Sequence, residues 1–93
     1  EAITDGLTGL LNRRYLNKEL AELCHQGKNV FTLALFDLDN FKQLNDRFGH
    51  LLGDRVLQFF ASLLKKHCVD KPHIAARFGG EEMALIFIDT PFT

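Results

Sequence analysis

The sequence predicts a small α/β (α+β) domain whose elements follow the order α-β-α-α-β-β. Three stretches repeat apolar residues at the period of a helix, and three apolar runs have the length of strands. Glycine, proline and asparagine stand between these segments, as is typical of turns and helix ends. At 93 residues the chain has room for one small domain, so we expect no second domain within residues 1–93.

The first predicted element is a helix that begins after Asn12, a residue suited to the N-cap, and runs to about Gln26. Gly27 fits its C-terminal cap, and Lys28–Asn29 would complete a short loop. The apolar face of this helix carries Leu16, Leu20 and Leu23.

The second element is a strand over Val30–Phe36. This run is almost continuously apolar, which favours a strand buried on both faces at the centre of the sheet. The strand ends at Asp37. A short helix follows, which Asp39 or Asn40 can cap and Gly49 stops.

A longer helix is predicted from about Leu51 to His67, before a break at Lys71–Pro72. Its helically spaced apolar residues are Leu52, Val56, Phe59, Phe60, Leu63 and Leu64. We expect Phe59 and Phe60 to pack in the core rather than to stack on bases.

The runs Ile74–Phe78 and Met83–Ile88 predict a β-hairpin with Gly79-Gly80-Glu81-Glu82 at its tip. The two glycines tolerate positive φ and let a ligand approach the backbone closely. Two adjacent acids also suit a charged surface turn, and the hairpin alone leaves both interpretations open.

Other carboxylates decide between them. A right-handed crossover would bring the Asp37 end of the first strand and the Glu81 turn to the same edge of the sheet. If the third strand lies antiparallel beside the first, Asp37 and Glu81, with Glu82 as a further candidate, come within reach of one ion. Carboxylates at such a place, next to a helix N-terminus, suit Mg²⁺ and the phosphates it carries.

Composition excludes several classes of function. The net charge is -1, so no basic field indicates a nucleic-acid partner. The longest apolar stretch is too short to span a bilayer, and we expect a cytoplasmic segment without direct membrane contact. Cys24 and Cys68 lack metal-site spacing and are expected to be reduced, packed thiols, with a disulfide as the lesser alternative.

Four motifs, in the right order and at the right spacing, resemble those of the GGDEF family of diguanylate cyclases. They are Asp5–Arg14, Asp37–Asp46, Phe48–Asp54 and Arg77–Glu82. The signature here is a GGEEM variant, Gly79-Gly80-Glu81-Glu82-Met83, and its methionine replaces a usual phenylalanine at a cost in packing more than in chemistry. The resemblance implies a nucleotide-cyclase or polymerase-palm-like fold, with an antiparallel-dominated sheet flanked by helices.

The resemblance also implies an activity. Bacterial family members condense two GTP molecules into cyclic di-GMP, a second messenger of signal transduction, and use Mg²⁺, with Mn²⁺ as an alternative. The implied metal ligands are Asp37, the Leu38 carbonyl and Glu81. Glu81 is also the implied proton acceptor and thus the candidate catalytic residue.

The implied substrate-binding residues lie between the first strand and the hairpin. Asn45 and Asp54 would select guanine, because a carboxylate can accept from both N1–H and the exocyclic amine. His50 matches a substrate-contacting position, and Phe41-Lys42 resembles a backbone phosphate-binding turn. Taken singly, Asn45, Asp54 and His50 also suit an exposed helix residue, a first-turn acid and a cap or packed imidazole.

The family's product-inhibition site is expected to be absent. Its arginine and aspartate are replaced here by Asp70 and His73, and neither supplies the planar fork that pairs with phosphate and guanine.

Partners follow from the same resemblance. We expect GTP as substrate, a homodimer for catalysis, and an N-terminal sensor or helical linker entering at Glu1, in a protein that is cytosolic or has a membrane anchor elsewhere. Family domains continue well beyond the equivalent of Thr93, so the chain is expected to be the N-terminal portion of one domain, incomplete at its C-terminus and inactive alone. The alternative function is an inactive GGDEF module that binds nucleotide or acts in regulation or dimerisation.

Overall fold

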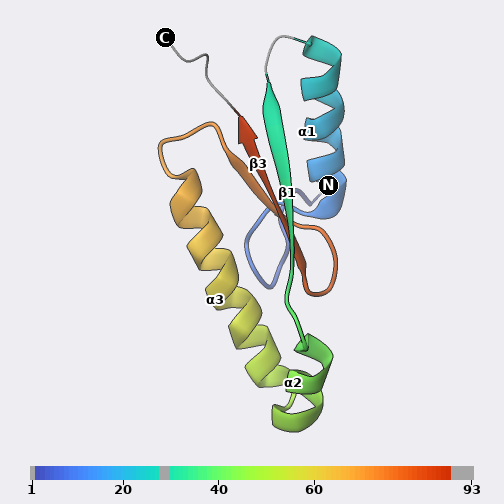
Figure 1. The fold of residues 1–93 in the computed structure, drawn as a ribbon, viewed down its shortest axis with the longest axis vertical. Coiled ribbons are helices and arrows are strands. Elements are labelled where there is room, and N and C mark those ends of the chain that lie inside the picture. The colour runs from blue at the N-terminus through green and yellow to red at the C-terminus, as the bar shows by residue number, and fades with distance from the viewer. Residues whose placement is uncertain (1, 28–29, 89–93) are drawn as a thin grey trace.

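The computed structural model describes residues 2–27 and 30–88, and the predicted loop at Lys28–Asn29 lies outside them, as do Glu1 and Thr93. The elements follow the predicted order (Figure 1). They are α1 (Arg13–Gln26), β1 (Phe31–Asp37), α2 (Phe41–Phe48), α3 (His50–Cys68), β2 (Ile74–Arg77) and β3 (Glu82–Ile88).

The three strands form one sheet in the order β1-β3-β2. Both outer strands run antiparallel to β3, so β1 and β2 point the same way, as the predicted crossover requires. The register between β1 and β3 begins with Phe31 opposite Ile88 and ends with Asp37 opposite Glu82. The end of β1 therefore lies beside the hairpin turn.

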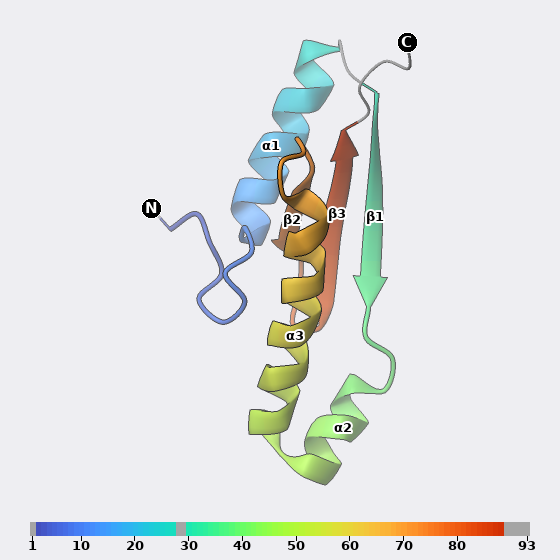
Figure 2. The ribbon, with the colours of Figure 1, turned by 90° about the vertical axis from the view of Figure 1, so that its left-hand side faces the viewer.

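Helices cover both faces of the sheet, with α1 on one side and α3 on the other, while α2 lies beyond the end of β1 (Figures 1 and 2). The side chains of β3 alternate between the two helices. On the α3 side, Met83 and Leu85 pack with Leu57, Ala61 and Leu64. On the α1 side, Ala84 and Ile86 pack with Leu16 and Leu23.

The helix ends follow the predicted local signals. Asn12 Oδ1 accepts a hydrogen bond from the Tyr15 amide at 2.9 Å, and α1 ends at Gly27 in the left-handed conformation with φ 64°. Gly49, with φ 92°, separates α2 from α3. Positive φ favours glycine at both places because a Cβ atom would be strained there.

The predicted central position of the first strand is wrong for the part of the chain that the structure describes. The buried central strand is β3, in which Met83 to Ile86 are all buried. In β1, which has one open edge, Leu33 and Leu35 are 40% and 58% exposed. An apolar run indicates that a strand is suited to burial. Whether the strand is buried depends on the elements that pack against it.

The predicted apolar face of α3 is shifted. The buried residues are Gly53, Leu57, Ala61 and Leu64. Phe59 is 66% exposed, contrary to expectation, whereas Phe60 packs edge-on against Phe36 with ring centroids 5.7 Å apart. The small residues Gly53 and Ala61 lie on the buried face of the helix, and Phe59 lies on the exposed face.

The two cysteines differ from each other. Cys68 is half-buried and its burial raises the pKa of the thiol, but Cys24 is exposed, so the expectation of a packed thiol is wrong there. Both thiols are free. Within residues 2–27 and 30–88, no helix combines the length and the apolar character needed to cross a membrane.

Met83 gives a test of the core. Its side chain is fully buried, so Met83→Ala should lower the free energy of unfolding by about 2–5 kcal/mol through lost contacts and a residual cavity. Leu51→Ala is the control, because Leu51 is 73% exposed and its truncation should cost no more than about 0.5 kcal/mol. Urea unfolding measures both, and equal losses would contradict this assignment of the core.

Candidate functional site

A cleft of about 510 Å³ opens between α2, α3 and the hairpin turn, a size suited to a small ligand. All five predicted substrate-binding residues line it, together with Gly80 and Glu81 of the signature. The complete lining is Phe41, Lys42, Asn45, Asp46, His50, Asp54, Leu57, Arg77, Gly80 and Glu81. Residues from two distant stretches of the chain therefore meet at one place.

Helical spacing places most of this lining. Phe41 and Asn45 lie four residues apart on α2, and His50 and Asp54 have the same separation on α3. Residues four apart share one face of a helix, so each helix turns one face toward the cleft.

Asn45 has a polar atom without a partner. Its Oδ1 is buried, and no donor among the described residues reaches it. The side chain occupies space that a Cβ on Gly53 would fill, since that Cβ would overlap Asn45 Oδ1 and lie 3.2 Å from Phe41 Cζ. A buried acceptor without a partner costs about 1–3 kcal/mol, so a ligand that donates a hydrogen bond here would be favoured.

The first turn of α2 also has unused hydrogen-bonding capacity. Asn40 occupies the N-cap position, as predicted, but it lies in the left-handed region with φ 60° and its side chain makes no capping hydrogen bond. The amides at the start of a helix need partners, and an anion at this end is stabilised by them. Phe41 and Lys42, which begin the helix, both line the cleft.

The predicted metal ligands lie where β1 meets the hairpin turn. Asp37 is directly opposite Glu82, and the Leu38 amide donates to the Glu81 carbonyl at 3.3 Å. Like charges facing each other across a ladder are destabilising. The donors are carboxylate and carbonyl oxygens, which suit Mg²⁺.

The predicted metal ligands are not all gathered at one place in the structure. Glu81 lines the cleft, whereas Asp37 and Leu38 adjoin it through the ladder without lining it. The described ranges hold no cluster of three or more His, Cys, Asp or Glu side chains placed for a metal ion, so Glu82 does not add a third carboxylate. The predicted set of two carboxylates and one carbonyl fits the ion by its chemistry.

The signature glycines act differently from the prediction. Neither Gly79 nor Gly80 is among the described residues with positive φ. A Cβ on Gly79 would instead overlap the Glu82 carboxylate, whereas a Cβ on Gly80 would meet nothing within 4 Å. Space for the neighbouring acid, rather than backbone strain, explains the glycine at position 79.

Arg77 and Asp5 were not predicted as site residues. Arg77 Nη1 lies 3.2 Å from both carboxylate oxygens of Asp5, and the same guanidinium donates to the carbonyls of Gly79 and Gly80. Both residues stand in the quoted motifs, but no sequence signal pairs positions 72 residues apart.

The environment of Asp5 shifts its titration. Burial alone would raise the pKa, but the hydrogen bonds from Thr8 and then the charge and hydrogen bonds of Arg77 outweigh it, so the pKa of Asp5 lies below its usual 3.8. The ionised form is therefore the one that the fold favours.

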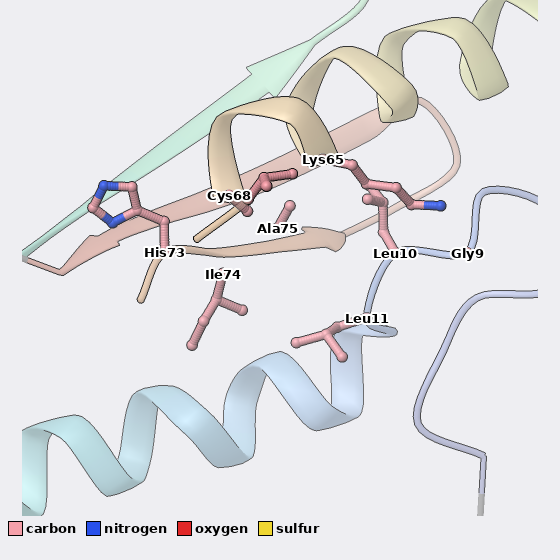
Figure 3. Close-up of a pocket in the computed structure, with 9 residues that line it drawn as sticks. Gly9, Leu10, Leu11, Lys65, Cys68, His73, Ile74 and Ala75 are labelled. Carbon is pink, nitrogen blue, oxygen red and sulfur yellow. The ribbon is translucent and has the colours of Figure 1, made fainter. Parts of the chain in front are cut away.

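A second hollow, of about 320 Å³, lies along β2 away from the acids (Figure 3). It is lined by Gly9, Leu10, Leu11, Lys65, Cys68, Val69, His73, Ile74 and Ala75. His73 Nδ1 accepts from the Ile88 amide at 3.1 Å, and its ring packs on Phe87, while Asp70 is exposed with φ 58°. The absence of a product-inhibition site at Asp70 and His73 stays a prediction.

Comparison with known proteins identifies the family. Residues 2–93 match the family model described as "Diguanylate cyclase, GGDEF domain". The chain belongs to the GGDEF family. It is 44% identical over 86 residues to diguanylate cyclase VdcA of Vibrio cholerae, covering 92% of this chain and 25% of VdcA. It is also 44% identical over 94 residues to response regulator PleD of Caulobacter vibrioides, covering 96% of this chain and 20% of PleD.

Solved structures agree with this GGDEF assignment. The GGDEF domain of DgcB from Caulobacter crescentus, crystallised in complex with c-di-GMP, superposes with a TM-score of 0.86 at 41% identity. The alignment covers 98% of this chain and 54% of that one. The antiparallel sheet flanked by helices is thus confirmed as a GGDEF fold. The chain spans a quarter or less of the length of VdcA and PleD.

The dependence of thermal stability on pH below neutrality tests the ion pair between Asp5 and Arg77. A depressed carboxyl pKa contributes stability that is present above the unfolded pKa of about 3.9 and is lost as pH falls through the folded value. The difference in thermal midpoint between wild type and Asp5→Asn should therefore be largest above pH 5 and shrink toward pH 3. Glu22→Gln, which removes an exposed acid from α1, is the control; a difference for Asp5→Asn that does not vary with pH would contradict the assignment.

Proposed function

We propose that the protein containing this chain is a diguanylate cyclase that condenses two GTP molecules into cyclic di-GMP and releases pyrophosphate. The observation that carries this proposal is the cleft, in which Asn45 and Asp54 of the two helices face Glu81 of the signature turn. Membership of the GGDEF family and the similarity to VdcA support the same activity.

Guanine recognition falls to α2 and α3. The Asp54 carboxylate can accept from N1–H and the exocyclic amine of guanine, a pair of donors that adenine lacks. The Asn45 side chain, which also lines the cleft, is the second polar group proposed to contact the base. His50, one helical turn before Asp54, contacts the nucleotide from the same face.

The triphosphate lies at the other end of the cleft. The amides that begin α2, at Phe41 and Lys42, bind phosphate oxygens, and the Lys42 ammonium adds a positive charge. Asp37, the Leu38 carbonyl and Glu81 would hold Mg²⁺, with Mn²⁺ as an alternative. When bound, the ion offsets charge on the phosphates and lowers the pKa of a coordinated hydroxyl.

The reaction requires two copies of the site. The 3′-hydroxyl of one GTP attacks the α-phosphate of the other, a P–O bond forms, and the bond to the β-phosphate breaks to release pyrophosphate. Glu81 accepts the hydroxyl proton. The same step in the opposite direction closes the ring, so a homodimer that apposes two clefts is the proposed assembly.

Regulation and location complete the proposal. A sensor or helical linker preceding the chain would set the geometry of the dimer, in the cytoplasm. Asp70 and His73 would give no product inhibition. The alternative, a GGDEF module that binds nucleotide without turnover, retains the α2 and α3 contacts and lacks only the chemical step.

Formation of cyclic di-GMP distinguishes a diguanylate cyclase from a module that only binds nucleotide. The full-length protein, incubated with GTP and Mg²⁺, should form cyclic di-GMP, and Glu81→Gln should abolish it, with an expected loss of at least about a thousandfold, because the variant loses a metal ligand and the proton acceptor together. Chromatography of the products measures both. Glu22→Gln is the control for loss of an acid. Bound GTP without product in wild type would favour the alternative, and full activity of Glu81→Gln would exclude its assigned role.

Gly53 offers a test of base recognition. Gly53→Ala should displace Asn45 from the cleft and weaken GTP binding by about tenfold, the loss expected for one hydrogen bond to the ligand. The added Cβ would lie 3.2 Å from Phe41 Cζ at a buried position, so the thermal midpoint is measured beside the affinity and the affinity is compared for folded protein. Gly6→Ala, where a Cβ meets nothing within 4 Å, is the control. Calorimetry with GTP measures the change, and unaltered affinity in Gly53→Ala would argue against a role of Asn45.

A further inference from the structure

The Arg77 guanidinium is hydrogen-bonded to the backbone of the turn that carries the signature. Arg77 is the last residue of β2, and its backbone amide is fixed by the Leu11 carbonyl at 2.9 Å. Its Nε lies 3.3 Å from the carbonyls of both Gly79 and Gly80, and Nη2 donates to Gly80 at 2.8 Å. These bonds hold the backbone immediately before Glu81, so the position of Glu81 depends on the guanidinium.

The other side of the guanidinium is held by Asp5. Arg77 Nη1 lies 3.2 Å from each carboxylate oxygen of Asp5, and both side chains are about one-fifth exposed. The carboxylate in turn accepts from the Thr8 amide at 2.9 Å and from the Thr8 hydroxyl at 2.8 Å. The Asp5 amide donates to the Leu10 carbonyl and the Gly9 amide donates to the Asp5 carbonyl, which closes a turn over residues 5–10. These bonds hold Asp5 in place.

The signature turn, residues 78–81, separates two spaces. On one side is the cleft, which Arg77 and Gly80 line. On the other is a hollow of about 250 Å³ lined by Asp5, Asn12, Arg13, Arg77, Phe78, Gly79 and Gly80, and here the Arg13 guanidinium lies 4.3 Å above the Phe78 ring. The N-terminal segment, residues 2–12, and the start of α1 thus support the turn from behind.

We propose that Arg77, fixed by Asp5, is a positioning residue that sets the placement of Glu81, and that the N-terminal segment controls turnover through this contact. A displacement of the N-terminal segment that breaks the contact between Asp5 and Arg77 would release the turn. The same segment also packs on α3, through Leu10 in the core and through the hydrogen bond from Gln58 Nε2 to the Leu7 carbonyl. Single substitutions of Asp5 or Arg77 leave those contacts in place and isolate the effect on the turn. This inference rests on the proposed cyclase function for its kinetic consequence, but its structural part stands on the contacts alone.

The cleft is formed by α2 and α3 on one side and by the signature turn on the other, and this arrangement predicts different effects of releasing the turn on kcat and on KM. The proposed base and phosphate contacts come from α2 and α3, and two of the three proposed metal ligands, Asp37 and the Leu38 carbonyl, lie at the end of β1. The turn supplies Glu81, the proposed proton acceptor and third metal ligand. Release of the turn should therefore lower kcat and leave the KM for GTP little changed. A merely structural role of the pair would lower the amount of folded protein and would not divide kcat from KM.

The experiment compares Asp5→Asn, Arg77→Lys and Glu22→Gln in the full-length protein. Asparagine keeps the shape of Asp5 without its charge, lysine keeps the charge of Arg77 without its planar fork, and Glu22→Gln removes an exposed acid from α1. Steady-state kinetics gives kcat and KM for GTP, and amide hydrogen exchange followed by mass spectrometry reports on the turn. Thermal unfolding identifies any variant that does not fold.

We expect Asp5→Asn to lower kcat about tenfold and Arg77→Lys by up to about a hundredfold, with KM within about threefold of wild type, because small misplacements of reacting groups have effects of this order. Exchange in residues 78–82 should accelerate while α3 is unchanged. Glu22→Gln should match wild type in both measurements. If Arg77→Lys fails to fold, Asp5→Asn decides.

Wild-type kcat and wild-type exchange at the turn in a folded Asp5→Asn would overturn the proposal. If the wild-type protein forms no cyclic di-GMP, the proposed function fails, and exchange at the turn still decides whether Asp5 and Arg77 position it. Faster exchange confined to the turn supports the contact, and uniform acceleration across the domain contradicts it.

Discussion

The antiparallel register between β1 and β3 is the constraint on which the site depends. Because Phe31 pairs with Ile88, Asp37 stands opposite Glu82 and the Leu38 amide reaches the Glu81 carbonyl. A slip of one residue would turn every side chain of β1 to the other face and separate the two acidic segments. The same ladder places α2, which begins four residues after Asp37, so one pairing positions both the acids and the start of the helix.

Features with local causes could be predicted from the sequence. Asn12, Gly27 and Gly49 mark helix ends through their own backbone and side-chain chemistry, and each does so in the structure. The spacing that puts Phe41 with Asn45, and His50 with Asp54, on one face of each helix is likewise a local property. Such signals need no knowledge of distant residues.

Three features that depend on distant residues were not predicted. The run Val30–Phe36 is apolar enough for a central strand, but among the described residues β3 is the strand that pairs on both sides. Phe59 satisfies the helical period, yet the buried face of α3 carries Gly53, Leu57, Ala61 and Leu64. The contact of Asp5 with Arg77 has no sequence signature, because it forms only when the N-terminal turn and the hairpin meet.

The division of the cleft has a consequence for how such a domain can evolve. The direct contacts proposed for the base and the phosphates lie in one continuous stretch, residues 41–54, while the proton acceptor and its support lie in the hairpin and the N-terminal segment. On the proposed function, affinity and catalysis are therefore separately mutable. A descendant with an altered Arg77 or Glu81 can lose the enzyme and keep a guanine-nucleotide receptor, which gives a gene duplicate a direct route from synthesis to sensing.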